Sequence, residues 1–269
     1  GTAIVKVFDM TAASTGLNSR ALTTLSMPFL SSITHSPEPV TYYPGSSTQS
    51  VKLFYTPDTG RILGAQVVGY NAVDRTINAL AIAIHANMTV YDLEKVELAY
   101  APPYGAAKDV VNVAGYVAAN RLRGSTDMVE WQEVAEHRDK YTVVDVRTVP
   151  EWTVSHMAGA LHIPNSEKRS RLAELPKDKD LVVYCQVGRR AYVMERLLKQ
   201  HGYKVKNLSG GWTTYAVATE PQSNFDPQKP ASDASEGSTG GAPASSTTPA
   251  DDKSAGSGSV ASTRLDAPS

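Results

Sequence analysis

Cysteine is nearly absent from this sequence, in which Cys185 stands alone among 269 residues. A single cysteine cannot form a disulfide within the chain, so any thiol–disulfide chemistry of Cys185 needs a sulfur from another molecule. The six histidines are scattered along the chain and lack the spacing of metal ligands. Because zinc and related ions are usually held by clustered cysteine and histidine side chains, we expect no metal site.

The sequence also has little net charge and no long hydrophobic run. Its 26 basic and 27 acidic residues give a formal net charge of -1, which provides no field to attract nucleic acid or anionic lipid. No apolar stretch approaches the ~20 residues of a membrane-spanning helix. The first residues, GTAIVKVFDM, lack the basic start and apolar core of a secretory signal. We therefore expect no nucleic-acid partner, no membrane partner and a cytoplasmic location.

Residues 1–123 group their predicted strands and helices in blocks. The segments SVKLFYT and ILGAQVVGY flank the turn PDTGR, a pattern typical of an antiparallel hairpin. The helical segments NAVDRTINALAIAIHANM and DVVNVAGYVAAN follow, and Thr89 with Asp92 has the spacing of a helix-capping box. This grouping predicts an α+β domain, an antiparallel sheet with helices.

Residues 124–219 instead alternate between helix and strand. Helices are predicted in DMVEWQEVAEHR and RAYVMERLLKQHG, one or two helical turns in RSRLAEL, and strands in YTVVDV, DLVVYC and KVKNL. Alternation with uninterrupted apolar strands is typical of a parallel sheet with helices on both faces, so we expect a separate α/β domain. Residues 220–269 are dominated by Ser, Gly, Ala, Pro, Thr and Asp, and we expect them to form a disordered tail.

The single cysteine lies where the strand DLVVYC ends and a helix begins, which is where parallel sheets bind their ligands. Backbone N–H groups at a helix start can converge on the sulfur and favour its thiolate form. We therefore interpret Cys185 as a nucleophile and Arg190 as the arginine that closes its loop. The residues between them, predicted to bind the substrate, are Gln186, Val187, Gly188 and Arg189. The alternative is that Cys185 is a small buried hydrophobe.

Two chemistries use a cysteine held in this way. Phosphoryl transfer from a phosphotyrosine-like ester needs five residues between the cysteine and the arginine, whereas only four separate Cys185 from Arg190. The position six beyond the cysteine is Ala191. The shorter loop favours transfer of a sulfane sulfur, and a phosphatase stays as the weaker interpretation.

Residues 124–219 resemble a single rhodanese, or sulfurtransferase, domain. VVDVRTVPEWTVSHMAGALHIP is similar to the opening signature of that family, YCQVGRRA to its active-site loop and LSGGW to its closing motif. The resemblance implies that the Cys185 thiolate takes the outer sulfur of a donor, becomes a persulfide and yields the sulfur to an acceptor thiol or cyanide. We interpret Asp145, Arg147 and Glu151 as scaffold residues in ion pairs and caps, and His156 as a structural histidine.

Residues 1–123 contain four distinctive segments, AIVKVFDMTAASTGL, YYPGS, GAQVVG and YAPPYGAAKDVVNVAGYVAAN. These segments resemble the dimerisation domain of the flavin-dependent pyridine nucleotide-disulfide reductases, and within them the coenzyme A-disulfide reductase branch. The resemblance implies a homodimer in which Tyr42 and Tyr100 reach into the partner subunit's reductase site, beside its catalytic cysteine. The alternative is that both tyrosines are ordinary core or interface aromatics.

The sequence has no G-x-G-x-x-G after a strand, no second cysteine, and Gly1 rather than Met at its start. We therefore expect the FAD-binding and NAD(P)H-binding domains and the reductase cysteine to lie outside this chain. The first hypothesis is the C-terminal part of a coenzyme A-disulfide or persulfide reductase fused to rhodanese. Its substrates would be coenzyme A persulfide, glutathione persulfide or thiosulfate, and its rhodanese step would need no cofactor. The second hypothesis is a dimerisation module with a non-catalytic rhodanese-like domain that binds thiols or partners.

Overall fold

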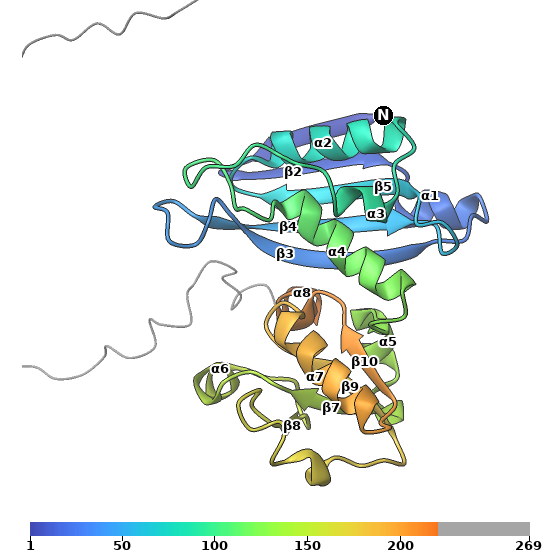
Figure 1. The fold of residues 1–269 in the computed structure, drawn as a ribbon, viewed down its shortest axis with the longest axis vertical. Helices are drawn as coiled ribbons and strands as arrows, with labels where there is room; N and C mark the ends of the chain where they lie inside the picture. Colours follow the sequence, from blue (N-terminus) through green and yellow to red (C-terminus); the bar gives the residue numbers. More distant parts are fainter. Residues whose placement is uncertain (220–269) are drawn as a thin grey trace, which may run out of the picture. The chain divides into compact units, whose positions relative to one another are not determined.

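The computed structural model describes residues 1–219, so the disorder predicted for residues 220–269 lies outside the described residues. Residues 1–219 fall within one compact unit and contain two sheets of five strands each (Figure 1). None of the described helices is long and apolar enough to cross a membrane. The two sheets have different strand directions and separate cores, as the change of pattern along the sequence predicts.

The first sheet is antiparallel throughout, with strand order β1-β2-β5-β4-β3. Its strands are β1 (Thr2–Val7), β2 (Met10–Gly16), β3 (Leu30–Glu38), β4 (Ser47–Tyr55) and β5 (Ile62–Gly69). The predicted hairpin is the β4–β5 pair, and Gly60 in its turn has φ +74°, which favours glycine. The short helix α1 (Ser19–Thr24) was not predicted, because its six residues show too little periodicity.

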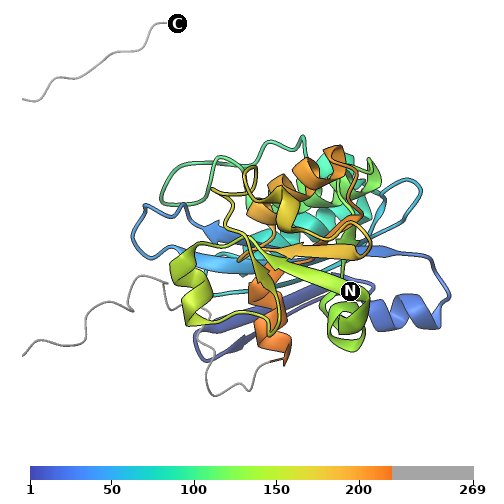
Figure 2. The ribbon, with the colours of Figure 1, turned by 90° about the horizontal axis from the view of Figure 1, so that it is seen from below.

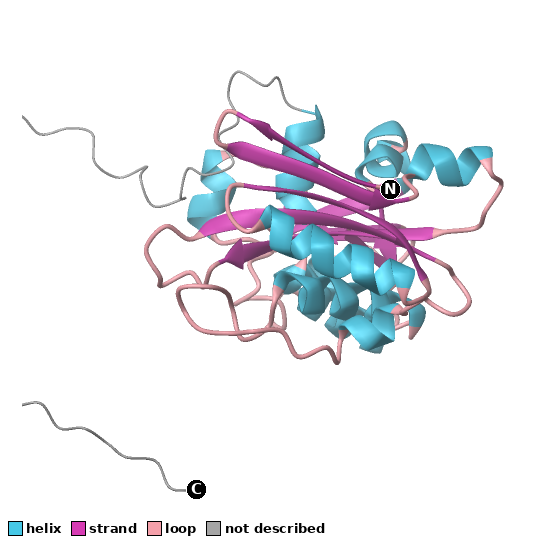
Figure 3. Ribbon diagram, turned by 90° about the horizontal axis from the view of Figure 1, so that it is seen from above, coloured by secondary structure: helices cyan, strands magenta, loops and turns pink. Residues whose placement is uncertain are grey.

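Three further helices belong to the first sheet: α2 (Val73–His85), α3 (Val90–Leu93) and α4 (Val110–Leu122). Buried side chains of α2 and α4 share one apolar core with those of β4 and β5, and Figure 3 shows helices lying along the strands. The predicted capping box of Thr89 and Asp92 is present at the start of α3. At Gly115 a Cβ would lie 2.7 Å from Leu93 Cβ, so the absence of a side chain lets α4 approach α3 closely.

The second sheet is parallel throughout, with strand order β6-β10-β9-β7-β8. Its strands are β6 (Met128–Val129), β7 (Tyr141–Asp145), β8 (Leu161–His162), β9 (Asp180–Tyr184) and β10 (Val205–Leu208). Its α-helices are α5 (Trp131–Glu136), α6 (Val149–Val154), α7 (Arg189–Gln200) and α8 (Gly211–Thr219). Short 3-10 turns lie at Arg138–Lys140 and Leu172–Glu174.

Strand β9 shows why this domain forms a sheet covered on both faces. Leu181 and Val183 point into one core and Val182 and Tyr184 into another, because side chains alternate across a strand. Figure 2 shows helices on both sides of these strands. The carboxyl end of β9 therefore emerges from the middle of the sheet, and the next residue is Cys185.

The structure corrects two local predictions in this domain. The predicted helix DMVEWQEVAEHR is wrong at its start, where Met128 and Val129 pair with β10 and α5 begins only at Trp131. Strands β6 and β8 were not predicted, and each has two residues, too few to show an alternating pattern.

Candidate functional site

Cys185 lies directly between the end of β9 and the loop that leads into α7. Its sulfur accepts a hydrogen bond from the Gly188 N–H at 3.2 Å. The residue as a whole is only 1% exposed, and it forms part of the apolar core beneath the loop. A backbone N–H directed at the sulfur, at the start of a helix of 12 residues, favours negative charge there. The structure thus places Cys185 at the junction of a strand end and a helix start, with a backbone N–H directed at its sulfur.

Gly188 is the residue that turns the loop back onto the sulfur. Its φ of +98° lies in the region that residues with side chains rarely adopt. A Cβ would not obstruct the loop at this position. A Cβ would come no nearer than 3.8 Å to its surroundings, at Asn207 Oδ1. The backbone conformation is therefore what favours glycine at this position.

The carbonyl groups of the same loop are bound by the first turn of α8. Trp212 N–H donates to the Cys185 carbonyl at 2.8 Å, and Thr213 N–H donates to the Gln186 carbonyl at 3.0 Å. The first N–H groups of a helix have no partner within the helix, so they are available to bind these carbonyl groups. Gly211, with φ +59°, allows the close approach, since a Cβ there would lie 2.4 Å from the Cys185 carbonyl oxygen. The motif LSGGW thus supports the loop that bears the nucleophile.

Arg190 forms a bidentate ion pair with Glu151, with N–O distances of 2.7 and 2.5 Å. The hydrogen bond to Glu151 raises the pKa of Arg190, and both the charge of Cys185 and a hydrogen bond to it act in the same direction. The guanidinium therefore lies beside both the thiol and the carboxylate. Arg189 is exposed, so the structure places Arg190, and not Arg189, next to the sulfur.

The Glu151 carboxylate binds both Thr148 and Arg190. Its Oε2 accepts from the Thr148 N–H at 2.9 Å and from the Thr148 hydroxyl at 2.7 Å, which completes a capping box at the start of α6. Burial alone would raise the pKa of Glu151, but the hydrogen bonds from Arg190 and Thr148 outweigh it and lower that pKa to about 2. The sequence predicts Glu151 as a scaffold residue but does not reveal its contact with Arg190.

A second charged pair lies beneath the loop. Arg147, 2% exposed, binds Asp145 at 2.8 Å and lies 4.9 Å from the centroid of the Trp212 ring. It also donates to Gln186 Oε1 at 3.4 Å, and the Gln186 amide donates to Thr213 Oγ1 at 3.0 Å. The ion pair of Asp145 and Arg147 is thus present, and its arginine orients a side chain of the predicted substrate loop. Val187, like Gln186, is half-buried.

His156 stacks on the Trp152 ring, with 3.6 Å between the ring centroids, and its Nδ1 lies 3.0 Å from the Trp152 carbonyl oxygen. Both contacts fit a structural histidine. Among the described residues no three His, Cys, Asp or Glu side chains are placed to hold a metal ion together.

Tyr42 and Tyr100 lie in two loops of the first domain, and both are exposed, at 72% and 48%. A hydrogen bond to the Tyr100 side chain is the main cause that raises the pKa of the Tyr42 hydroxyl. Arg75 anchors both loops, since it binds Glu38 Oε1 at 2.6 Å and the Tyr104 carbonyl oxygen at 2.5 Å. The fold thus brings together two tyrosines that are 58 positions apart in the sequence.

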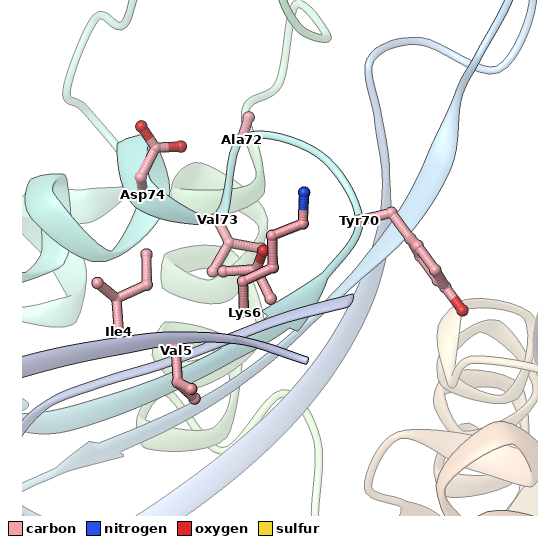
Figure 4. A pocket seen from close by; sticks show the side chains of 8 residues that line it. Ile4, Val5, Lys6, Tyr70, Ala72, Val73 and Asp74 are labelled. Carbon is pink, nitrogen blue, oxygen red and sulfur yellow. The ribbon is translucent and has the colours of Figure 1, made fainter. Parts of the chain in front are cut away.

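An open groove elsewhere in the first domain does not include these side chains. It lies between β1 and the start of α2 (Figure 4). Its lining residues are Ile4, Val5, Lys6, Thr11, Tyr70, Ala72, Val73 and Asp74. Neither Cys185 nor the tyrosine pair lines this groove, so it is separate from the chemistry described above.

The two domains each match a known family. Residues 2–110 match the family described as pyridine nucleotide-disulphide oxidoreductase, dimerisation domain, and residues 130–218 match the rhodanese-like domain. The chain thus resembles an oxidoreductase dimerisation domain in residues 2–110 and a rhodanese-like domain in residues 130–218. The predicted fold class, an antiparallel α+β domain followed by a parallel α/β domain, is confirmed.

Known proteins are similar to this chain over most of its length or over a part of it. The coenzyme A disulfide reductase of Staphylococcus haemolyticus is 39% identical over 120 residues, which are 44% of this chain and 26% of that protein. The crystal structure of reduced Bacillus anthracis CoADR-RHD is similar over 80% of this chain and 39% of that one, with 42% identity and a TM-score of 0.78.

The NAD-dependent persulfide reductase from A. fulgidus covers the same shares, with 38% identity and a TM-score of 0.73. The chain thus spans about a quarter of the curated relative and about two fifths of these two solved chains.

Proposed function

We propose that this chain is the C-terminal part of a coenzyme A-disulfide or persulfide reductase in which Cys185 carries sulfane sulfur. The observation on which the proposal rests is the Cys185 sulfur at the start of α7, bound by the Gly188 N–H and flanked by Arg190. That arrangement favours a thiolate without a general base, because the loop amide and the guanidinium both stabilise negative charge.

The sulfur transfer would proceed in two displacements without net oxidation. The Cys185 thiolate attacks the outer sulfur of a donor such as glutathione persulfide or coenzyme A persulfide, and the donor's S–S bond breaks to release its thiolate. The persulfide now on Cys185 is attacked at its outer sulfur by an acceptor thiolate, which takes that sulfur and regenerates the Cys185 thiolate. Thiosulfate would serve in the same way, with sulfite as the leaving group. The loop N–H holds negative charge at the sulfur in each step.

The reductase chemistry would require FAD and NAD(P)H, and the described residues do not fit either cofactor. Neither sheet carries a G-x-G-x-x-G turn between a strand and a helix, the feature that binds the pyrophosphate of a dinucleotide. The cofactors would therefore bind outside this chain. In a homodimer formed by the first domain, Tyr42 and Tyr100 would contribute their hydroxyl groups to the partner subunit's reductase site.

A test of the sulfur-carrier role uses the purified chain and glutathione persulfide. Intact-mass spectrometry is expected to show the addition of one sulfur atom, and subsequent cyanide is expected to remove it as thiocyanate. Cys185→Ala should show neither signal, while Tyr203→Phe, a change remote from the loop, should retain both. Sulfur uptake by Cys185→Ala equal to that of the unmodified chain would refute the role.

A second candidate function is a non-catalytic domain that binds thiols. The observation in its favour is that Cys185 is only 1% exposed, which restricts access to its sulfur. Under this alternative the purified chain would bind a thiol ligand in calorimetry but would add no sulfur in the mass measurement. Hydrolysis of an aryl phosphate that depends on Cys185 would instead support the phosphatase interpretation.

A further inference from the structure

Asn207 is a polar side chain in an otherwise apolar position beneath the Cys185 loop. It lies in β10, is 5% exposed, and donates its amide hydrogen to the Gly188 carbonyl at 3.1 Å. Gly188 is also the residue whose N–H binds the Cys185 sulfur at 3.2 Å. One side chain of the sheet therefore contacts the residue that binds the sulfur.

The backbone of Asn207 is fixed from both sides. It pairs with Val183 in β9 and with Met128 in β6, and its N–H donates to the Asp127 carbonyl at 2.7 Å. The side chain thus starts from the interior of the sheet, where the backbone moves least. A hydrogen bond from a side chain anchored in the sheet interior can hold a loop more firmly than one from another loop residue.

The asparagine at this buried position lowers the stability of the fold in one respect. Within the described part of the chain its Oδ1 has no hydrogen-bond partner, and a buried oxygen without a partner is destabilising. Its neighbours along the strand, Val205 and Leu208, are buried apolar residues, so an apolar side chain would suit the core better. The contact with Gly188 is the feature that an apolar residue could not supply.

The geometry of Gly188 links its two hydrogen bonds. Its φ is 98° and its ψ is -20°, and its carbonyl accepts from both Asn207 and the Tyr192 N–H, the latter at 2.9 Å. The N–H and the C=O of Gly188 belong to two rigid peptide planes that are joined by its φ and ψ. When the carbonyl is held, only these two torsions can still change the direction of the N–H. A glycine would otherwise have the widest freedom to turn that N–H away from the sulfur.

We propose that Asn207 is a positioning residue for the sulfur carried by Cys185. By holding the Gly188 carbonyl it keeps the Gly188 N–H on the sulfur, both in the thiolate and in the persulfide. This inference rests on the sulfur-carrier function proposed above, but its geometric part concerns only the thiol and its loop. The side chain would act through the Gly188 carbonyl that it binds.

The test compares variants of the full chain at position 207. Asn207→Leu removes the donor and keeps a similar volume, Asn207→Thr keeps a shorter donor, and Asn207→Val has the shape of threonine without the donor. The matched control is Val205→Ala, which opens a cavity in the same strand without touching the loop. The measurements are urea unfolding, the rate of Cys185 alkylation by iodoacetamide as a function of pH, and kcat and KM for sulfur transfer.

The proposal predicts that Asn207→Leu and Asn207→Val shift the alkylation profile to higher pH. They should also lower kcat about tenfold with KM changed less than twofold, which corresponds to a barrier increase of about 1.4 kcal/mol. Asn207→Thr should recover part of the loss. Val205→Ala should unfold at lower urea and keep the alkylation profile of the unmodified chain. If Asn207→Leu does not fold, the comparison of Asn207→Thr with Asn207→Val, which has the same shape without the donor, decides the question.

The outcomes separate this inference from the proposed function. An unshifted alkylation profile in a folded Asn207→Leu, or an equal shift in Val205→Ala, would overturn the positioning role while leaving sulfur transfer intact. A shifted profile in a chain that never takes up sulfur would instead support the positioning of the thiol and reject the sulfur-carrier function. A kcat loss without any alkylation shift would also contradict the proposal, because the Gly188 N–H acts on the thiolate itself.

Discussion

Glu151 and Arg190 form a bidentate ion pair that joins the start of α6 to the start of α7, across 39 positions of the sequence. The same carboxylate caps α6 through Thr148. The arginine beside the nucleophile is therefore held by a residue whose other role is to begin a helix. Changes at Glu151 should affect both the stability of the domain and the reactivity of the thiol.

Glu151→Gln should lower the free energy of unfolding by about 1 kcal/mol, the size expected for an ion pair that remains in contact with solvent. The neutral amide can still accept from Thr148 but attracts the guanidinium less. Urea unfolding measures the loss, and Glu174→Gln, which removes a carboxylate exposed to solvent on the same domain, is the matched control. A loss at Glu174 as large as that at Glu151 would contradict the special role of the Arg190 contact.

The contribution of Glu151 should also depend on pH. Its pKa in the folded chain is about 2, below its ordinary value of 4.5, so the folded state favours the ionised form. The stabilisation is therefore fully present above about pH 4.5 and is lost as the pH falls toward 2. The difference in unfolding free energy between the unmodified chain and Glu151→Gln should stay constant from pH 6 to 8.

That difference should shrink as the pH falls below 4.5. A difference that grew on acidification would show that the ion pair does not lower this pKa.

Gly211→Ala should disturb the Cys185 loop more than an equally strained substitution elsewhere. A Cβ at Gly211 would meet the Cys185 carbonyl at 2.4 Å, whereas a Cβ at Gly202 meets nothing within 4 Å, although both glycines have positive φ. Both alanine variants should lose about 1–2 kcal/mol from backbone strain. Only Gly211→Ala should slow iodoacetamide alkylation of Cys185, and equal alkylation rates in the two variants would refute the clash.

The tyrosine pair can be tested without the reductase. Tyr100→Phe removes the side chain whose hydrogen bond raises the pKa of Tyr42, so the Tyr42 hydroxyl should titrate at lower pH. Carbon-13 NMR of labelled tyrosines would follow this titration, with Tyr42→Phe to assign the resonance. Tyr104→Phe is the control, because Tyr104 is 70% exposed and contributes a backbone carbonyl rather than its hydroxyl to the loop. An unchanged Tyr42 titration in Tyr100→Phe would show that the two hydroxyls are not coupled.

Much of the fold was predictable from periodicity. The apolar run of β9 and the hairpin around Gly60 have patterns that few other structures satisfy. The two-residue strands β6 and β8 were not predictable, since their pairing depends on neighbours that the local sequence does not contain. Tertiary contacts decide such short elements.

The candidate site likewise has parts that the sequence predicts and parts that it does not. The place of Cys185 at a strand end and of Arg190 in the first turn of a helix follows from local order along the chain. The contact of Arg190 with Glu151 joins segments 39 positions apart, and no local pattern indicates it. Asn207 was likewise missed, because a polar residue within the four-residue strand VKNL has no distinctive signature.

The burial of Cys185 restricts which molecules can reach its sulfur. Because only 1% of the residue is exposed, the bulky disulfide of another folded protein cannot approach the thiol. A sulfur atom in transit would be sheltered from the many competing thiols and oxidants of its surroundings. Burial of the carried sulfur, as well as activation of the thiol, would then preserve the sulfur until its acceptor takes it.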